Sequence, residues 1–207
     1  MPAGRIRSKS VQIDESATLA RAQQGDPEAF SYLVEVYQKP VYNLCYRMLS
    51  NAEDAEDAAQ EVFLRAYKSI KQYDRNRPFP TWLLSIAAHY CIDQIRKQRL
   101  PVFSLDDQPY YDLCDQTPGP ERSMSQMEDR KQIRLLLESV APLDRAAVVM
   151  YYWYDFSYEE IAQSLSLTES AVKSRLHRAR KEMARLWLEQ NPQAIPVERK
   201  PHESPAF

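Results

Sequence analysis

Apolar residues recur at helical spacing along two long stretches of the chain, residues 19–99 and about 129–190. Steps of three and four residues place such side chains on one face of an α-helix. The first stretch is interrupted at residues 50–54 and again at 73–80, so it predicts several helices packed as a bundle. The pattern therefore predicts an all-α protein made of two small helical domains.

Segments without this repeat flank and separate the two helical stretches. Between positions 101 and 128 there are four prolines and six acidic residues against one basic residue. A stretch of this length without an apolar repeat is typical of a linker, and the polar chain ends are typical of disordered tails. We expect a tail at 1–14, a first domain at 15–100, a flexible acidic linker at 101–128, a second domain at 129–190 and a tail at 191–207.

The last helical segment has one apolar face and one basic face. The apolar stripe consists of Val172, Leu176, Ala179, Met183 and Leu186. The opposite face holds Ser170, Ser174, His177, Arg178 and Lys181, with Lys173 at its margin. Residues 171–190 carry six Lys or Arg and two Glu, a local charge of +4 in a chain whose net charge is −2. This charge alone leaves two interpretations open, a solvated helix face and a nucleic-acid contact.

A second, shorter helix is predicted directly before the basic one. Ser157 and Glu160 have the spacing of a capping box, which starts a helix by satisfying its free N–H groups. A short break at 166–168 follows, in which Thr168 can cap the next helix. Two helices joined by a turn of three or four residues match the helix-turn-helix layout, whose second helix enters the major groove.

At this point the segment LDRAAVVMYYWYDFSYEEIAQSLSLTESAVKSRLHRARKEM resembles the C-terminal domain of bacterial sigma factors of the extracytoplasmic-function type, within the sigma-70 family. The run AVKSRLHRARK is more specific than a generic helix-turn-helix, although Ser166 stands where the family commonly has a glycine. The resemblance implies that this helix reads the minus-35 element of a promoter. Carried over by position, its DNA-binding residues are Ser170, Lys173, Ser174, His177, Arg178 and Lys181. We expect Arg175 and Arg180 to be structural or phosphate-facing.

The segment from Asp54 to Ile70 predicts a helix with an acidic outer face. Its core face consists of Ala55, Ala59, Val62, Ala66 and Ile70. Leu64 lies among charges on the opposite face. Two interpretations are open, an isolated surface leucine, which is common, and the centre of a partner-binding surface. Similar sigma factors dock this helix on the coiled coil of the polymerase beta-prime clamp. The resemblance assigns core polymerase binding to Asp54, Asp57, Gln60, Glu61 and Leu64.

Cations and aromatic residues follow in the loop at 73–80 and the helix after it. Arginines can bind phosphates and flat rings can stack on unpaired bases, which is what single-stranded DNA binding requires. The pattern resembles the minus-10 domain of the family, where a base is flipped from the non-template strand into a pocket formed by this loop. The implied minus-10 residues are Arg75, Asn76, Arg77, Phe79, Trp82, His89 and Arg96. The family often has Asn in place of His89, which bears on the promoter sequence preferred.

The composition argues against several other classes of protein. Three glycines leave little room for a phosphate-binding loop, and there is neither a Ser/His/Asp arrangement nor a pair of carboxylates in a plausible cleft, so we expect no enzyme and no cofactor. Single histidines such as His89 and His177 are poor candidates for metal ligands, so we expect no metal site. Cys45, Cys91 and Cys114 are odd in number and form no CxxC pair, which favours inert thiols.

The sequence also bears on location. No run approaches the ~18–20 consecutive apolar residues of a membrane span, and the N-terminal segment lacks the apolar core of a signal peptide. We therefore expect a cytoplasmic protein without direct membrane insertion.

The resemblance as a whole implies a non-enzymatic transcription initiation factor. Its partners would be core RNA polymerase, contacted at the beta-prime clamp and the beta flap, promoter DNA, and an anti-sigma factor, which in the family is often membrane-anchored. The alternative is a stand-alone helix-turn-helix regulator that binds operator DNA without joining polymerase.

Overall fold

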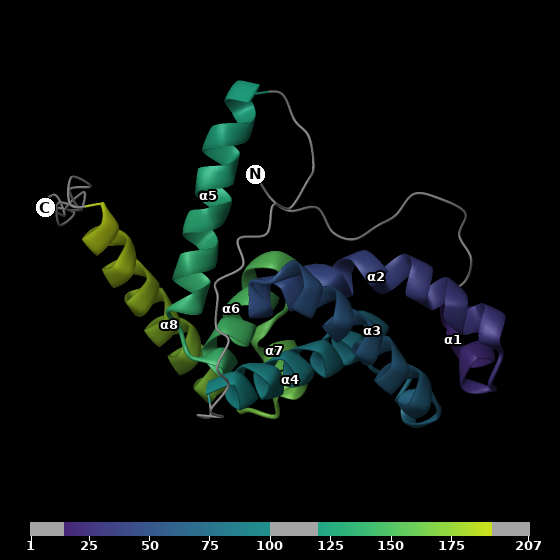
Figure 1. Ribbon diagram of the computed structural model, residues 1–207. Coiled ribbons are helices and arrows are strands. Elements are labelled where there is room, and N and C mark those ends of the chain that lie inside the picture. Colours follow the sequence, from purple (N-terminus) through teal and green to yellow (C-terminus); the bar gives the residue numbers. More distant parts are fainter. Residues whose placement is uncertain (1–14, 100–119, 192–207) are drawn as a thin grey trace, which may run out of the picture.

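The computed structural model describes residues 15–99 and 120–191 of the 207 residues. Every regular element in these residues is a helix, which confirms the predicted all-α class. The predicted tails, apart from Asn191, and residues 101–119 of the predicted linker lie outside the described part. We call α1–α4 the first half and α5–α8 the second half. The elements are α1 (Glu15–Gln23), α2 (Pro27–Leu49), α3 (Ala52–Ser69), the short 3-10 helix η1 (Ile70–Gln72), α4 (Phe79–Arg99), α5 (Pro120–Glu138), α6 (Pro142–Tyr154), α7 (Tyr158–Leu165) and α8 (Glu169–Gln190) (Figure 1).

The interruption near residue 50 is a helix end followed directly by a cap. Ser50 lies in the left-handed region, with φ of 63°, and donates its N–H to the carbonyl of Tyr46 at 2.8 Å. Asn51 then caps α3, because its side-chain oxygen accepts the Asp54 N–H at 3.0 Å. Asp26 caps the start of α2 in the same way. Such caps satisfy groups that a helix end leaves free.

The core of the first half forms around α2, which packs against α1, α3 and α4. Helix α3 contributes the buried residues Ala55, Ala58, Val62 and Ala66 to this core. The prediction placed Ala59 rather than Ala58 in this core, and Ala59 is only half-buried. With 3.6 residues per turn, positions 58 and 59 both lie close to the stripe, so spacing alone does not separate them.

The second half contains the predicted helix-turn-helix, and both predicted caps are present. The Ser157 hydroxyl accepts the Glu160 N–H at 3.1 Å, while the Glu160 carboxylate accepts the Ser157 N–H at 2.8 Å. Thr168 caps α8 by accepting the Ala171 N–H at 3.2 Å. The turn between α7 and α8 passes through Ser166 in the left-handed region. That conformation costs a residue with a Cβ about 1–2 kcal/mol.

Helix α5 begins at Pro120, whereas the apolar repeat predicted a helix only from about residue 129. Proline is well tolerated in a first turn, since its missing N–H has no helical partner there. The segment that follows, ERSMSQMEDR, is mostly polar, so it gives no periodic apolar signal even though it is helical. The part of the predicted linker from residue 120 onward is therefore helix, and this boundary was wrong.

The two halves share a packed interface centred on α6. Seven successive residues of this helix, 144–150, are buried, because α7 and α8 cover one side and α2 and α4 cover the other. Such burial on all sides agrees with the long apolar run of its sequence. The periodicity analysis did not predict this contact between the halves.

Side chains of α6 also bind backbone carbonyls of α2 and α5. The buried Arg145 guanidinium donates through Nη1 to Met48 O, near the C-terminal end of α2, and through Nη2 to Glu138 O at 3.1 Å. The hydroxyl of Tyr154 donates to Pro40 O at 2.6 Å. A cation at a helix C-terminus is favoured by the helix dipole and satisfies carbonyls that have no helical partner. Arg145 therefore joins the ends of α2 and α5.

Candidate nucleic-acid and polymerase-binding surfaces

The basic face predicted on α8 is exposed along its whole length. Val172, Leu176 and Ala179 of the predicted apolar stripe are buried against the rest of the second half, whereas Met183 and Leu186 are half-buried. The residues of the opposite face, which we call the α8 face, are all exposed: Ser170, Lys173, Ser174, His177, Arg178 and Lys181. The helix therefore presents hydroxyl, imidazole and cationic groups outward on a rigid support.

Lys173 is the member of the α8 face with the most local contacts. Its Nζ lies 5.5 Å from the centre of the Tyr158 ring and 4.0 Å from a carboxylate oxygen of Glu169. A cation over an aromatic face and an exposed ion pair are each weakly attractive. These contacts bias Lys173 toward the junction of α7 and α8 without removing it from solvent.

Two arginines of α8, Arg175 and Arg178, contact the same carboxylate, that of Asp144. Arg175 Nη1 donates to Asp144 Oδ1 at 2.6 Å, and Arg178 Nη2 lies 3.8 Å from Asp144 Oδ2. Arg175 thus has a structural contact, one of the two roles expected for it. The sequence analysis missed Asp144, whose only signal was an acidic residue next to the apolar run of α6.

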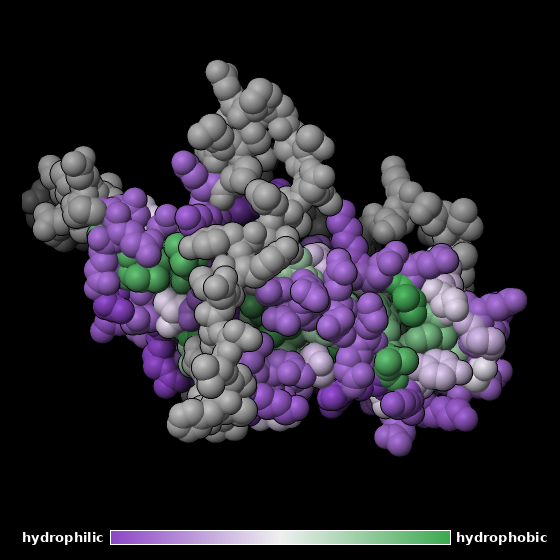
Figure 2. Space-filling view, in the orientation of Figure 1, coloured by the Kyte–Doolittle hydropathy of each residue, from purple (hydrophilic) through white to green (hydrophobic). Residues whose placement is uncertain are grey.

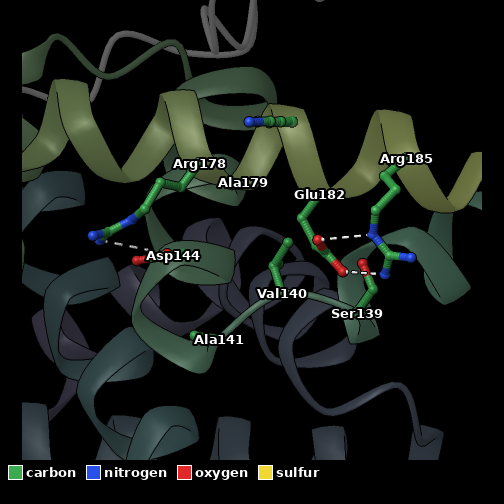
Figure 3. A pocket seen from close by; sticks show the side chains of 9 residues that line it. Ser139, Val140, Ala141, Asp144, Arg178, Ala179, Glu182 and Arg185 are labelled. Atoms are coloured by element: carbon green, nitrogen blue, oxygen red, sulfur yellow. Dashed lines mark hydrogen bonds and ion pairs between the residues drawn. The ribbon is translucent and has the colours of Figure 1, made fainter.

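A cavity of about 410 Å³ adjoins this ion pair, between the α5–α6 turn and α8. Figure 3 shows Arg178 reaching from α8 toward Asp144 on one side, and Glu182 paired with Arg185 on the other. Lys181 of the α8 face also lines the cavity. Its walls therefore carry both charge signs.

The loop at 73–78 in the first half is held by its own side chains and by α1. Asp74 Oδ1 accepts both the backbone N–H and the side-chain amide of Asn76 at 2.9 Å. Arg75 Nη2 donates to the Ser16 hydroxyl at 2.9 Å and to the Ser16 carbonyl at 3.2 Å. Arg75, Asn76 and Arg77 are all exposed. The predicted cations and amide thus lie together at the surface on a restrained backbone.

An aromatic cluster supports this loop from beneath. The ring of Phe79 lies 5.2 Å from Tyr37, 5.5 Å from Tyr73 and 5.6 Å from Trp82, measured between centroids. Phe79 is 3% exposed, so its ring packs in the core beneath the loop. Trp82 is half-buried and keeps part of its indole accessible. The Tyr73 hydroxyl donates to Arg77 O, which fastens the loop to the cluster.

The remaining predicted minus-10 residues lie along the exposed side of α4. His89 is exposed, and its Nδ1 lies 2.8 Å from Ser85 O, so Nδ1 carries the proton and Nε2 points away from this bond. Arg96 is exposed about two turns further on, 3.9 Å from Asp93. Neither residue reaches the loop at 73–78 through a hydrogen bond among the described residues.

The acidic face of α3 has an apolar centre. Asp54, Asp57 and Gln60 are exposed and Glu61 is half-buried, while Leu64 is 54% exposed. Arg65 binds Glu61 at 2.8 Å and thereby lowers the pKa of that carboxyl. Figure 2 shows hydrophobic side chains at the surface over α3 within mainly hydrophilic surroundings.

Tyr67 extends this apolar centre, and the sequence analysis missed it. It is 49% exposed and packs edge-on against Phe30, with 4.9 Å between ring centroids. Residues three apart on a helix are neighbours, so Tyr67 lies beside Leu64. The spacing of three residues between Leu64 and Tyr67 was the sign in the sequence that Tyr67 belongs to the same surface.

The described residues contain no group of three or more His, Cys, Asp or Glu side chains that could hold a metal ion. Cys45 and Cys91 are free thiols buried between α2 and α4, and the pKa of Cys91 is raised by the neighbouring Cys45 thiol and by burial. Cys114 lies outside the described residues. Within the described ranges no helix combines the length and apolarity needed to cross a membrane.

In comparisons with known proteins, each half of the chain matches a family model. Residues 33–100 match the family model Sigma-70 region 2, and residues 130–183 match Sigma-70, region 4. The ECF RNA polymerase sigma factor SigW of Bacillus subtilis is 35% identical over 170 residues, which cover 78% of this chain and 90% of that protein.

Two solved structures share the fold. The structure of CnrH in complex with the cytosolic domain of CnrY has a TM-score of 0.63 at 22% identity, and covers 84% of this chain and 96% of CnrH. The sigma factor RpoE of Bartonella quintana, in complex with the anti-sigma factor NepR, has a TM-score of 0.58 at 20% identity, covering 76% and 96%.

A stand-alone regulator of operator DNA would share a helix-turn-helix but would not match region 2 as well. Here both regions are matched in family order, and identity to a polymerase sigma factor extends over most of both chains. The chain therefore belongs to the extracytoplasmic-function sigma factors of the sigma-70 family, non-enzymatic subunits that join bacterial core RNA polymerase and direct it to promoters.

Proposed function

We propose that the α8 face reads the minus-35 duplex. The observation that carries this proposal is the exposure of all six side chains above a buried stripe on one continuous helix. Lys and Arg can donate to guanine edges or to phosphates, while Ser and His suit either. Because cations replace counterions on phosphates, minus-35 binding should weaken steeply as salt increases.

The loop at 73–78, together with α4, traps the melted minus-10 strand in this proposal. Arg75, Asn76 and Arg77 are exposed on a restrained loop, and Trp82 keeps part of its ring accessible beside it. His89 and Arg96 continue the surface along α4. Capture of a flipped base requires such cations and flat side chains close together. Phe79 contributes from the core by supporting the loop.

Core polymerase docks on the acidic face of α3, with Leu64 and Tyr67 at its centre and the beta-prime clamp coiled coil as its partner. Exposed aromatic and aliphatic side chains within a polar rim are the usual centre of a protein interface. The second half then meets the beta flap. An anti-sigma factor, like the partner of the Bartonella quintana protein, would regulate the chain in the cytoplasm.

Run-off transcription with purified core polymerase and a promoter library tests these assignments. The full chain should stimulate transcripts from a subset of promoters, and Leu64→Asp should remove both stimulation and core binding. Tyr152→Asp, which places the same charge on another exposed hydrophobic position, is the matched control and should retain activity. Stimulation by the Leu64→Asp variant equal to that of the unmodified chain would exclude the α3 face as the docking surface.

A further inference from the structure

Asp144 is a nearly buried carboxylate beside a surface proposed to bind a polyanion. It lies in the first turn of α6, is 8% exposed and belongs to no predicted site. A carboxylate next to a DNA-binding face repels phosphates, so its presence weakens the general attraction of that face. Its two oxygens contact two different arginines of α8, and these contacts indicate its role.

The two arginine contacts differ in strength and in exposure. The contact with Arg175 is short, 2.6 Å, and that side chain is 26% exposed, so it compensates the charge of Asp144 in a poorly hydrated place. The contact with Arg178 is longer, 3.8 Å, and that side chain is 62% exposed. Arg175 therefore fixes the carboxylate, and the second oxygen remains directed at a guanidinium that solvent and DNA can reach.

The surroundings leave Arg178 free to move between Asp144 and a ligand. It lines the cavity of about 410 Å³ between the α5–α6 turn and α8, so its side chain can turn without disturbing the packed stripe of the helix. Figure 3 shows it extended from α8 toward Asp144 along the edge of that cavity. An arginine held by one weak contact keeps a preferred direction, which lowers the ordering cost of a directed contact.

We propose that Asp144 is a positioning residue that sets base preference at the minus-35 element by orienting Arg178. The inference rests on the proposed role of the α8 face. Partial neutralisation by Asp144 lowers the affinity of Arg178 for any phosphate, while the preferred direction of its side chain favours a planar contact with a base edge. Asp144 thus lowers the general affinity of the α8 face for DNA and raises its discrimination between base sequences.

The test uses holoenzyme reconstituted with the full chain and a promoter library randomised over the minus-35 element, with a constant minus-10 element. Asp144→Asn keeps the side-chain shape and can still accept the Arg175 hydrogen bond, but it removes the charge. It should lower the preference for the favoured base by about tenfold, the range of one specific base contact, at the position that Arg178→Ala also affects. Combining the two substitutions should add nothing to Arg178→Ala alone.

Asp155→Asn is the matched control, because it removes the same charge from the exposed C-terminal cap of α6, where Asn tolerates the left-handed conformation. It should leave base preference unchanged. Asp144→Glu keeps the charge and displaces it, so it should shift base preference while the unfolding midpoint stays near that of the parent. This variant also keeps the proposal testable should Asp144→Asn fold poorly.

Two results would overturn the proposal. One is a uniform loss of transcription from every minus-35 sequence in Asp144→Asn with base preference intact, which is the behaviour of a purely structural ion pair. The other is unchanged preference in both Asp144 variants. If the unmodified chain itself showed no minus-35 preference, the proposed role of the α8 face would fail first, and that outcome is visible before any variant is compared.

Discussion

The two proposed DNA-binding surfaces are held in place by different kinds of structure. The α8 face stands on one continuous helix whose buried stripe packs within the second half. The loop at 73–78 has no repeating backbone pattern, and it is held by Asp74, by Ser16 of α1 and by the aromatic cluster below. A duplex offers a regular groove that fits a helix, whereas a melted strand offers separate bases. In this proposal the regular duplex is therefore bound by a helix, and the irregular melted strand is bound by a restrained loop.

The largest expected effect comes from removing the support of the loop. Phe79→Ala deletes a core ring that contacts Tyr37, Tyr73 and Trp82, so it should cost about 3–5 kcal/mol in the free energy of unfolding. Urea denaturation measures this, and Tyr152→Ala, at an exposed ring that makes an edge contact with Tyr151, should cost only about 0.5–1.5 kcal/mol. A loss below about 1 kcal/mol would mean that the loop does not depend on this cluster.

A smaller effect is expected where the two halves are joined. Arg145→Ala leaves the carbonyls of Met48 and Glu138 without their buried donor, which should cost about 1–3 kcal/mol. Arg134→Ala removes an exposed ion pair instead and should change stability by less than about 1 kcal/mol. Equal unfolding free energies for the two variants would show that the contact between the halves adds nothing to stability.

On the helical side, the start of α8 depends on one cap. Thr168→Ala removes the acceptor of the Ala171 N–H, and should lower the unfolding free energy by about 1 kcal/mol. Thr168→Ser keeps the hydroxyl and should recover most of the loss. Hydrogen exchange at the Ala171 amide reports the same change locally, and unaltered protection there in Thr168→Ala would contradict this role of the cap.

The smallest effect is a gain. Ser166 has φ of 54° in the turn before α8, so Ser166→Gly relieves strain but adds freedom to the unfolded chain. The balance should raise the unfolding free energy by about 0.5–1 kcal/mol. Thermal unfolding detects this difference, and a lower midpoint would show that the hydroxyl or the Cβ of Ser166 contributes contacts that outweigh the strain.

The contrast between the surfaces also explains what the sequence could predict. The buried stripe of α8 and the caps at Ser157 and Thr168 follow from spacing within one segment, and the structure confirms them. The contact of Arg75 with Ser16 joins residues 59 positions apart, and no local pattern encodes it. Burial of Phe79 likewise depends on Tyr37 from another helix.

The contacts of charged residues were predicted less well than the burial of apolar residues. Asp144 and Arg145 are neighbours at the start of one apolar run, yet they point to different partners, the first to α8 and the second to the ends of α2 and α5. A helical wheel gives their directions relative to α6 but not what lies there. The run from Ala146 to Trp153 was the available sign that α6 is covered on more than one side.

The docking of α7 against α4 sets a geometric condition on promoter binding. Helix α4 belongs to the first half and α7 to the second, so their packing joins the half with the proposed minus-10 surface to the half with the proposed minus-35 surface. A promoter that holds its two elements further apart than this contact allows can be bound only after the interface opens. The free energy of that interface is then a threshold that polymerase and promoter together must exceed.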